Sequence, residues 1–318
     1  MIVIFLLSGA GLKTKVLLDA AASWRLHLLT QTVSLVFLPL FGFGLSSALW
    51  RTRLNRNLVS GIAVCLATST TASTNVVFTK TAGGNEALAL VNAVLGNLIG
   101  IFITPAWLET FLGSKTGHVP YAKVIQLLAC TVIAPLVVGN AAQYGFPGRV
   151  AWLKTKLDFS KAGSFCILLL VWSTFSNTFA KHVKVDAGSI IAVAALMLGT
   201  YLAATLSTFF ALLLPTPARL LHASERDAVA VAMCAGTKTV ALGIPIITAL
   251  YEGNPAVGLL SLPLIIYHAL QILLGSMLTA PIRRLVERRV AAREAEAAAA
   301  KGTPLQGIPE GAEEPSPV

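Results

Sequence analysis

Stretches of about 20 apolar residues recur along the chain, separated by short segments that hold most of its charged residues. Each stretch is long enough to cross a hydrocarbon core of about 30 Å as an α-helix. Inside lipid, only helices and closed barrels satisfy all backbone hydrogen bonds. The stretches do not alternate apolar and polar residues with a period of two, so a barrel is not expected. The sequence therefore predicts an all-α membrane protein whose surroundings are the lipid bilayer.

The low content of charge supports this prediction. Of 318 residues, 55% are hydrophobic and only 12% are charged, against about 25% charged in a soluble domain. The net charge is +10, but the bases lie in loops beside the apolar stretches, which indicates membrane topology and no nucleic-acid partner. Cys65, Cys130, Cys166 and Cys234 lie inside apolar stretches and form no CxxC pair. We therefore expect buried thiols, with no disulfide framework, metal site or cofactor.

The apolar stretches predict about nine transmembrane helices. They run over Met1–Gly11, Leu26–Leu49, Leu58–Thr81, Ala87–Leu112, Ala122–Tyr144, Ala162–Phe179, Gly188–Leu214, Asp227–Leu250 and Ala256–Leu285. The first stretch is too short to cross and lacks the basic start and small-residue cleavage site of a signal peptide. We therefore expect it to be the second half of a helix.

The loops divide unequally between two sides when they are assigned alternately. One side receives most of the bases, including those of Arg149–Lys161 and of the tail after Arg283, and the other receives fewer. The positive-inside rule places the base-rich side and the C-terminus in the cytosol. Residues 1–284 are predicted to form a transmembrane domain. Residues 285–318 are predicted to form a cytosolic helix over Arg288–Lys301 and a disordered, solvated tail, with a docking site as the alternative.

Two segments depart from the simple apolar pattern. Thr68–Glu86 and Cys234–Pro245 each have a polar, small-residue centre. Each leads through a Gly-Asn turn, the second at Glu252–Pro255, into an apolar helix that we expect to end at a proline, Pro105 or Pro281. Paired, interrupted segments are the best sequence indication of a secondary-transporter site, because unwound backbone can coordinate an ion or a polar solute. The alternative is that the small residues serve tight helix packing.

Lys238 is the most informative residue of these segments. It lies roughly midway between Arg226 and Glu252, and therefore near the middle of the membrane if the helix is regular. A lysine there costs about 2.5 kcal/mol or more, so a functional role is the first hypothesis. A structural lysine bound to carbonyl groups or to Glu86 is the alternative.

The other candidate ligands lie on the two segments, at the start of the helix after the first, or three residues apart on one face of the last span. The complete set is Ser73, Thr74, Asn75, Asn85, Glu86, Asn92, Asn97, Cys234, Thr237, Lys238, Thr239, His268 and Gln271. Interhelical hydrogen bonding is the alternative for the asparagines, and packing is the alternative for His268 and Gln271.

Several motifs resemble one known family. They are Ser8–Thr14, Gly83–Pro105, Thr237–Pro245 and Leu262–Gly275. With these motifs the chain, to about Arg284, resembles the bile acid:sodium symporter superfamily, solute carrier family 10. The most similar branch is that of the seventh human member and the fungal calcium-homeostasis regulators.

The resemblance implies ten helices in two inverted five-helix repeats, divided into a panel domain and a core domain. It implies that two broken helices cross in the core. It also implies that the chain starts inside the second helix of the family, with the first helix absent.

One departure from the family concerns sodium. Sodium-coupled members carry a Glu and a Gln on the second broken helix, and the matching positions here are Cys234 and Lys238. A thiol is a weak acceptor and an ammonium repels a cation. We therefore expect at least one sodium site to be lost, with the Lys238 ammonium standing in place of sodium or meeting an anionic solute.

The resemblance also implies negative regulation of cytosolic calcium. Calcium takes about six to eight oxygen ligands, and the membrane interior here offers only Glu86, so we expect an indirect effect. The first hypothesis is a solute carrier that works by alternating access in the plasma membrane. The alternative functions are a non-transporting regulator of a calcium channel and a sodium-coupled organic anion symporter. The alternative locations are the endoplasmic reticulum, the Golgi and the vacuole. An enzyme is not expected, because HExxH, GxSxG and P-loop patterns are absent.

Overall fold

In a computed structural model of the chain, every regular element of the described residues is a helix. The structure describes residues 2–11, 22–71, 73–116, 126, 129–157, 159, 162, 165–166, 168–169, 172–173, 176, 186–215, 221, 223–251 and 256–300. The elements are α1 (Ile2–Gly11), α3 (Trp24–Thr32), the π-helix η1 (Val33–Phe37), α4 (Leu38–Leu49), α5 (Arg56–Ala67), α6 (Ser73–Thr81), α7 (Glu86–Thr116), the π-helix η2 (Ala129–Ile133), α9 (Ala134–Gly145), α10 (Pro147–Lys156), α12 (Ala187–Leu212), α14 (Glu225–Gly236), α15 (Val240–Leu250) and α16 (Val257–Ala300). An all-α chain is therefore confirmed for this part of the sequence.

Five helical spans in the described part are long and apolar enough to cross a membrane. They are Trp24–Leu49, Glu86–Phe111, Ala187–Leu213, Glu225–Leu250 and Val257–Glu296, and the bent pair α9–α10 would add a sixth. Most of the predicted span Ala162–Phe179, and the first part of Ala122–Tyr144, lie outside the described residues. The count of about nine helices therefore stays a prediction.

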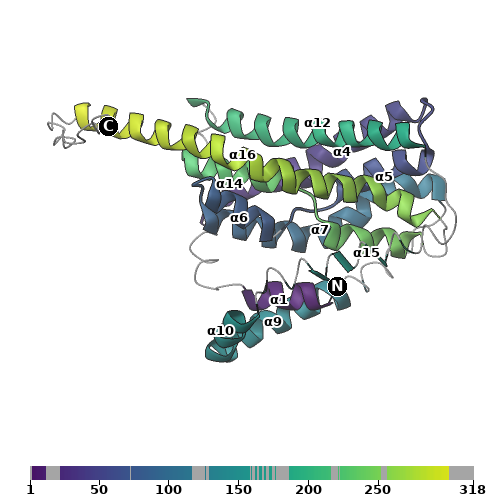
Figure 1. The fold of residues 1–318 in the computed structure, drawn as a ribbon, viewed down its shortest axis with the longest axis horizontal. Helices are drawn as coiled ribbons and strands as arrows, with labels where there is room; N and C mark the ends of the chain where they lie inside the picture. Colours follow the sequence, from purple (N-terminus) through teal and green to yellow (C-terminus); the bar gives the residue numbers. More distant parts are fainter. Residues whose placement is uncertain are drawn as a thin grey trace, which may run out of the picture.

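The helices form one bundle with a smaller group beside it. Figure 1 shows α12 and α16 running along the bundle, and α1, α9 and α10 packed together on its lower side. Side chains at Gly9 and Gly139 would collide with the carbonyl oxygens of Leu136 and Leu6, respectively. The two glycines therefore let the backbones of α1 and α9 touch, as small residues do between membrane helices.

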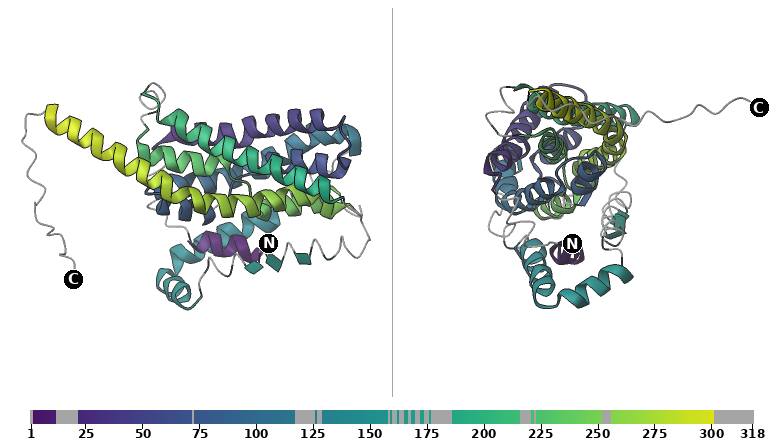
Figure 2. Two further views of the ribbon diagram at one scale, coloured as in Figure 1. Left: turned by 45° about the horizontal axis from the view of Figure 1, so that its top comes forward. Right: turned by 90° about the vertical axis from the view of Figure 1, so that its left-hand side faces the viewer.

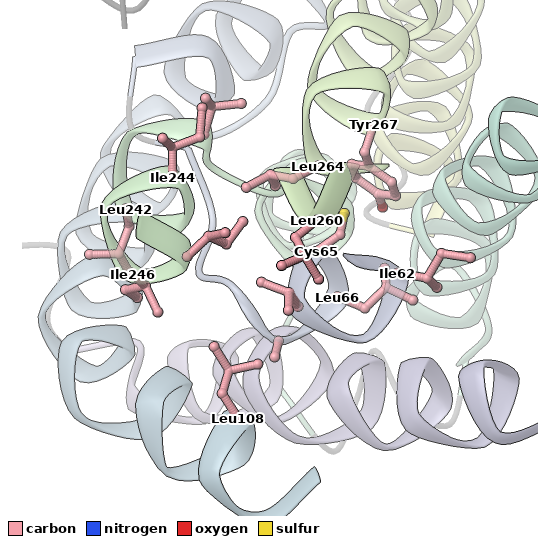
Figure 3. Packing of buried hydrophobic residues seen from close by; sticks show 14 of the residues in the cluster. Ile62, Cys65, Leu66, Leu108, Leu242, Ile244, Ile246, Leu260, Leu264 and Tyr267 are labelled. Carbon is pink, nitrogen blue, oxygen red and sulfur yellow. The ribbon is translucent and has the colours of Figure 1, made fainter. Parts of the chain in front are cut away.

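The interrupted span α14–α15 lies at the centre of the bundle. In its apolar window 94% of the residues are buried, against 33% for Ala187–Leu213. A hydrophobic cluster joins α5, α7, α15 and α16, as Figure 3 shows. Its labelled members are Ile62, Cys65, Leu66, Leu108, Leu242, Ile244, Ile246, Leu260, Leu264 and Tyr267. A second cluster joins α14 to α6, α7 and the outer part of α16.

The prediction that Pro105 and Pro281 end their helices is wrong. Both prolines lie inside helices, because α7 continues to Thr116 and α16 continues to Ala300. A proline removes one backbone hydrogen bond but does not prevent packing on either side of it. Ile282 and Val286 remain buried after Pro281, so the helix is held beyond the proline.

The outer helix predicted from Arg288 is therefore the end of α16 and not a separate helix. Figure 2 shows that this end projects beyond the bundle. Residues 301–318, which carry the predicted disordered tail, lie outside the described residues. The boundary at residue 284 stays a prediction.

Gly61 tests the close packing of α5 on α16. A Cβ atom at Gly61 would lie 2.5 Å from the Leu260 carbonyl oxygen and 2.9 Å from Pro263 Cδ. Because neither group can rotate away, we expect Gly61→Ala to destabilise the protein by about 1–3 kcal/mol. The measurement is the melting temperature in detergent. Gly44→Ala is the control, since nothing lies within 4 Å of its Cβ position; equal melting of the two variants would contradict this packing.

Candidate functional site

The two interrupted segments predicted from the sequence lie against each other in the bundle. The chain is unwound between α5 and α6 and again between α14 and α15. The Thr239 N–H donates to the Ser69 carbonyl at 2.8 Å, and the Thr70 and Thr237 hydroxyl oxygens are 2.7 Å apart. The two breaks are therefore joined by backbone and by side chains.

At the first break, where α5 ends, three successive backbone carbonyl groups receive no hydrogen bond from a following turn of helix. The Ala67 carbonyl accepts from the Thr104 hydroxyl at 2.9 Å. The Thr68 carbonyl accepts from Lys238 Nζ at 2.9 Å, and the Ser69 carbonyl accepts from Thr239. Each is satisfied by another element, as backbone in a membrane interior requires.

The second break is held mainly by α16. The Tyr267 hydroxyl donates to the Gly236 carbonyl at 2.5 Å. The Gln271 side chain accepts from the Lys238 N–H at 2.8 Å and donates to the Lys238 carbonyl at 2.7 Å. His268 Nδ1 lies 3.3 Å from the same carbonyl and 2.8 Å from Gln271 Nε2. The Gln271 side chain thus pairs with both backbone groups of Lys238, as a neighbouring β-strand would.

Asn75, at the start of α6, connects the side chains of both breaks. Its Nδ2 donates to the Thr70 hydroxyl at 2.6 Å, and its Oδ1 accepts from Thr237 at 2.8 Å and from Thr71 at 3.1 Å. Asn75 and Thr237 are fully buried. The structure therefore brings together six of the predicted residues: Asn75, Thr237, Lys238, Thr239, His268 and Gln271.

Lys238 is completely buried at the junction. Its Nζ donates to the Ser34 carbonyl at 2.7 Å and to the Thr68 carbonyl at 2.9 Å, and lies 3.4 Å from Ser34 Oγ. An ammonium has three N–H donors, and each has an oxygen here. All three oxygens are neutral, and Glu86 instead pairs with Lys80 at 3.4 Å. The environment of the ammonium is that of a small cation bound by carbonyl and hydroxyl oxygens.

Pro39 explains why the Ser34 carbonyl is available. In η1 the Leu38 N–H donates to Val33, one residue further back than in an α-helix. The next donor along the chain would be residue 39, but proline has no N–H. The freed Ser34 carbonyl binds Lys238, and the freed Leu35 carbonyl accepts from Trp107 Nε1 at 2.7 Å. The sequence analysis did not identify Ser34, although Pro39 inside an apolar span was the available signal.

Three other predicted residues line the neighbouring face of α7 or point toward it. Asn97 Oδ1 accepts from the Ser69 hydroxyl at 3.1 Å, and the buried Cys234 thiol lies 3.5 Å from the Ala89 carbonyl. Asn92 Oδ1 lies 3.0 Å from His27 Nδ1, and Gln31 Nε2 donates to the Asn92 carbonyl at 2.9 Å. His27 and Gln31 of α3 were not predicted, since they lie outside both interrupted segments.

Two buried amide atoms beside this face lack a hydrogen-bond partner within the described residues. They are Gln31 Oε1, an acceptor, and Asn92 Nδ2, a donor. Leaving such a group unpaired inside a protein costs about 1–3 kcal/mol. Gln31 Oε1 could therefore accept, and Asn92 Nδ2 could donate, one further hydrogen bond each.

The remaining predicted residues do not join the breaks. Asn85 begins α7 by accepting from the Leu88 N–H at 3.1 Å, and its Nδ2 donates to Asp227 at 2.8 Å. It follows Gly83, whose φ of 72° favours glycine. This turn and Glu86 lie beside the start of α14, whereas Lys238 follows its end. Thr74 is half-buried in α6, and the side chain of Ser73 lies outside the described residues.

Metal coordination is not indicated in the parts of the chain that the structure describes. Within these parts, no three His, Cys, Asp or Glu side chains come together in a way that could hold a metal ion. The junction offers neutral oxygens and one ammonium. Its chemistry suits a monovalent cation or an uncharged polar group better than a divalent metal.

Gln271 tests whether the second break depends on its side-chain clamp. Gln271→Leu would leave the Lys238 N–H unpaired and its carbonyl with only the longer contact to His268 Nδ1, and we expect a loss of about 1–3 kcal/mol in stability. The measurement is thermal unfolding in detergent, with Ser276→Ala as the control because Ser276 is exposed on the same helix. Unchanged melting of Gln271→Leu would show that the break is held without this residue.

Comparison with known proteins identifies the family. Residues 1–284 match the SBF-like CPA transporter family. The chain is 35% identical to sodium/bile acid cotransporter 7 of Danio rerio, covering 90% of this chain and 84% of that protein. It is 32% identical to solute carrier RCH1 of Candida albicans, covering 89% and 79%, and 34% identical to the Mus musculus cotransporter 7, covering 88% and 81%.

These relatives are named as transporters and not as enzymes, and the resemblance found in the sequence is confirmed. Their names agree with the apolar spans of the bundle. The chain belongs to the SBF-like CPA transporter family and is an integral membrane protein of the solute-carrier type.

Proposed function

We propose that this protein moves a small solute across the membrane by alternating access, with the junction of the two breaks as its working site. The observation that carries the proposal is the pairing of two interrupted spans, each followed by a long helix, α7 or α16. Broken helices with polar unwound centres are where secondary transporters bind their ligands. The inverted repeats and the division into a core and a panel belong to this proposal, with α1 and α9 in the panel.

The bonding of Lys238 favours a built-in cation over an anion-binding group. All three N–H donors of its ammonium face oxygens of Ser34 and Thr68, so none is left for an anionic solute in this conformation. We therefore propose that the ammonium occupies the place of a coupling cation and that transport does not require sodium there. The relatives named as sodium/bile acid cotransporters make a sodium-coupled anion symporter the alternative.

The polar groups near the breaks suggest the chemistry of the solute. Gln31 Oε1 and Asn92 Nδ2 offer one acceptor and one donor, and both are buried. These atoms favour a solute that carries an uncharged hydrogen-bonding group.

We propose that the physiological effect is negative regulation of cytosolic calcium, exerted from the plasma membrane with the C-terminus in the cytosol. The support is the resemblance to the fungal branch and the excess of bases on one side. An indirect effect fits the neutral oxygens of the junction, which do not suit calcium. A non-transporting regulator of a calcium channel is the second candidate, because the saturated bonds of Lys238 would also suit a static structural role.

Lys238→Ala separates these two candidates. In cells that lack the endogenous relative, we expect the wild-type protein to damp the rise in cytosolic calcium after an extracellular calcium pulse. Because the variant loses the charge at the junction, it should damp the rise several-fold less at matched surface expression. A fluorescent calcium indicator supplies the measurement.

Lys80→Ala is the matched control, since Lys80 is an exposed lysine at the end of the bundle, with a side chain that is 70% accessible. It should behave as the wild type. If Lys238→Ala damps calcium as well as the wild type does, the junction is not the working site and a regulator that binds a partner becomes the better account.

A further inference from the structure

The arginines of α16 lie where this helix leaves the membrane. Its apolar part, Val257–Ile282, is about 39 Å long at about 1.5 Å per residue, enough to cross a hydrocarbon core of about 30 Å. Arg283 and Arg284 follow directly, then Arg288, Arg289 and Arg293. The first of these arginines therefore stand at the level of the lipid headgroups.

Other elements begin at the same end of the bundle, since Leu26 of α3 and Ala228 of α14 lie in one hydrophobic cluster with Ile282 of α16. α3 begins with Trp24, which is 61% exposed, as tryptophan at a membrane interface often is. α14 begins beside the turn before α7, since the Asn85 N–H donates to the Arg226 carbonyl at 3.0 Å. Figures 1 and 2 show the end of α16 emerging from the bundle at this end.

Three of these arginines bind other groups of the protein. Arg289 donates to the Leu213 carbonyl, at the end of α12, at 3.1 Å. Arg293 forms an ion pair of 3.0 Å with the nearly buried Glu225 at the start of α14. Arg283 pairs with Glu287 at 2.8 Å. The contacts of Arg289 and Arg293 join α16 to the end of α12 and the start of α14, and so fix the rotation of α16 about its axis.

The fixed rotation leaves Arg284 and Arg288 exposed and four residues apart, on one face of the helix. Neither has a hydrogen-bond or ion-pair partner in the described parts of the chain. Glu294 and Glu296 follow further from the membrane, so along α16 the bases precede most of the acids. This order matches a leaflet that carries negative charge.

We propose that Arg284 and Arg288 form a binding site for the phosphate groups of anionic lipids. The planar guanidinium group pairs with phosphate oxygens through two parallel hydrogen bonds, and two such groups on one helical face can hold adjacent phosphates. Arg284 lies about 3 Å and Arg288 about 9 Å along the helix from Ile282, which is within the headgroup layer. The bound lipid would hold α16 at the depth where its inner arginines meet α12 and α14.

The test uses the full-length purified protein in detergent and short-chain lipids as probes. We expect dioctanoyl phosphatidylinositol 4,5-bisphosphate to bind more tightly than dioctanoyl phosphatidylcholine in a thermophoresis titration. Arg284→Gln combined with Arg288→Gln should weaken binding of the anionic lipid by about tenfold or more. The melting temperature of this variant should not change, because both side chains are exposed.

Arg51→Gln combined with Arg53→Gln is the matched control, as these arginines are exposed in the segment between α4 and α5. It should weaken binding less than twofold. An equal loss in both double variants would mean general charge attraction and would overturn the proposal. Unchanged binding in the α16 variant would also overturn the proposal. Competition by inositol trisphosphate at the same affinity would overturn it too, since the site would then hold a soluble phosphate.

Discussion

The ammonium of Lys238 is buried at the junction, and the two broken spans depend on how its three donors find oxygens. A lysine in a membrane interior costs about 2.5 kcal/mol or more unless oxygens replace its water. The chain supplies these oxygens from distant elements: Thr68 at the end of α5, and Ser34 in η1, where Pro39 frees a carbonyl. The Lys238 ammonium thus ties three spans together, and neither Ser34 nor Thr68 could offer its carbonyl if its span were a continuous α-helix.

The same requirement explains the neighbouring side chains. Unwound backbone in lipid needs partners, and here the partners come from helices that follow each break. α7 provides the Thr104 hydroxyl for the first break, and α16 provides Tyr267 and Gln271 for the second. A motion that separated α16 from α14 would have to replace these bonds, so a solute or cation bound at the proposed site would be coupled physically to helix packing. Such coupling is what alternating access needs.

The sequence was sufficient for the helical class, the family and both breaks, because interrupted apolar periodicity and buried polar residues are local signals. It identified Lys238, Asn75, Thr237 and Gln271, but not Ser34, whose carbonyl binds the Lys238 ammonium. Ser34 could not be found directly, since its role is carried by a backbone carbonyl that only the η1 geometry exposes. Pro105 and Pro281 misled the prediction of helix ends, because burial of residues such as Ile282 holds a helix together across a proline. Glu86 was considered as a partner for Lys238, but in the fold it lies beside the start of α14, whereas Lys238 follows the end of that helix.

The central claim is that a small cation at the Ser34 and Thr68 oxygens holds the two breaks together, and that Lys238 supplies it. The most direct measurement is the melting temperature of purified Lys238→Ala in methylammonium, sodium or choline chloride at equal ionic strength. We predict that the variant melts below the wild type in choline and is restored by methylammonium, and in part by sodium, while the wild type responds to neither. A variant that melts like the wild type in choline, or that no small cation restores, would contradict the claim.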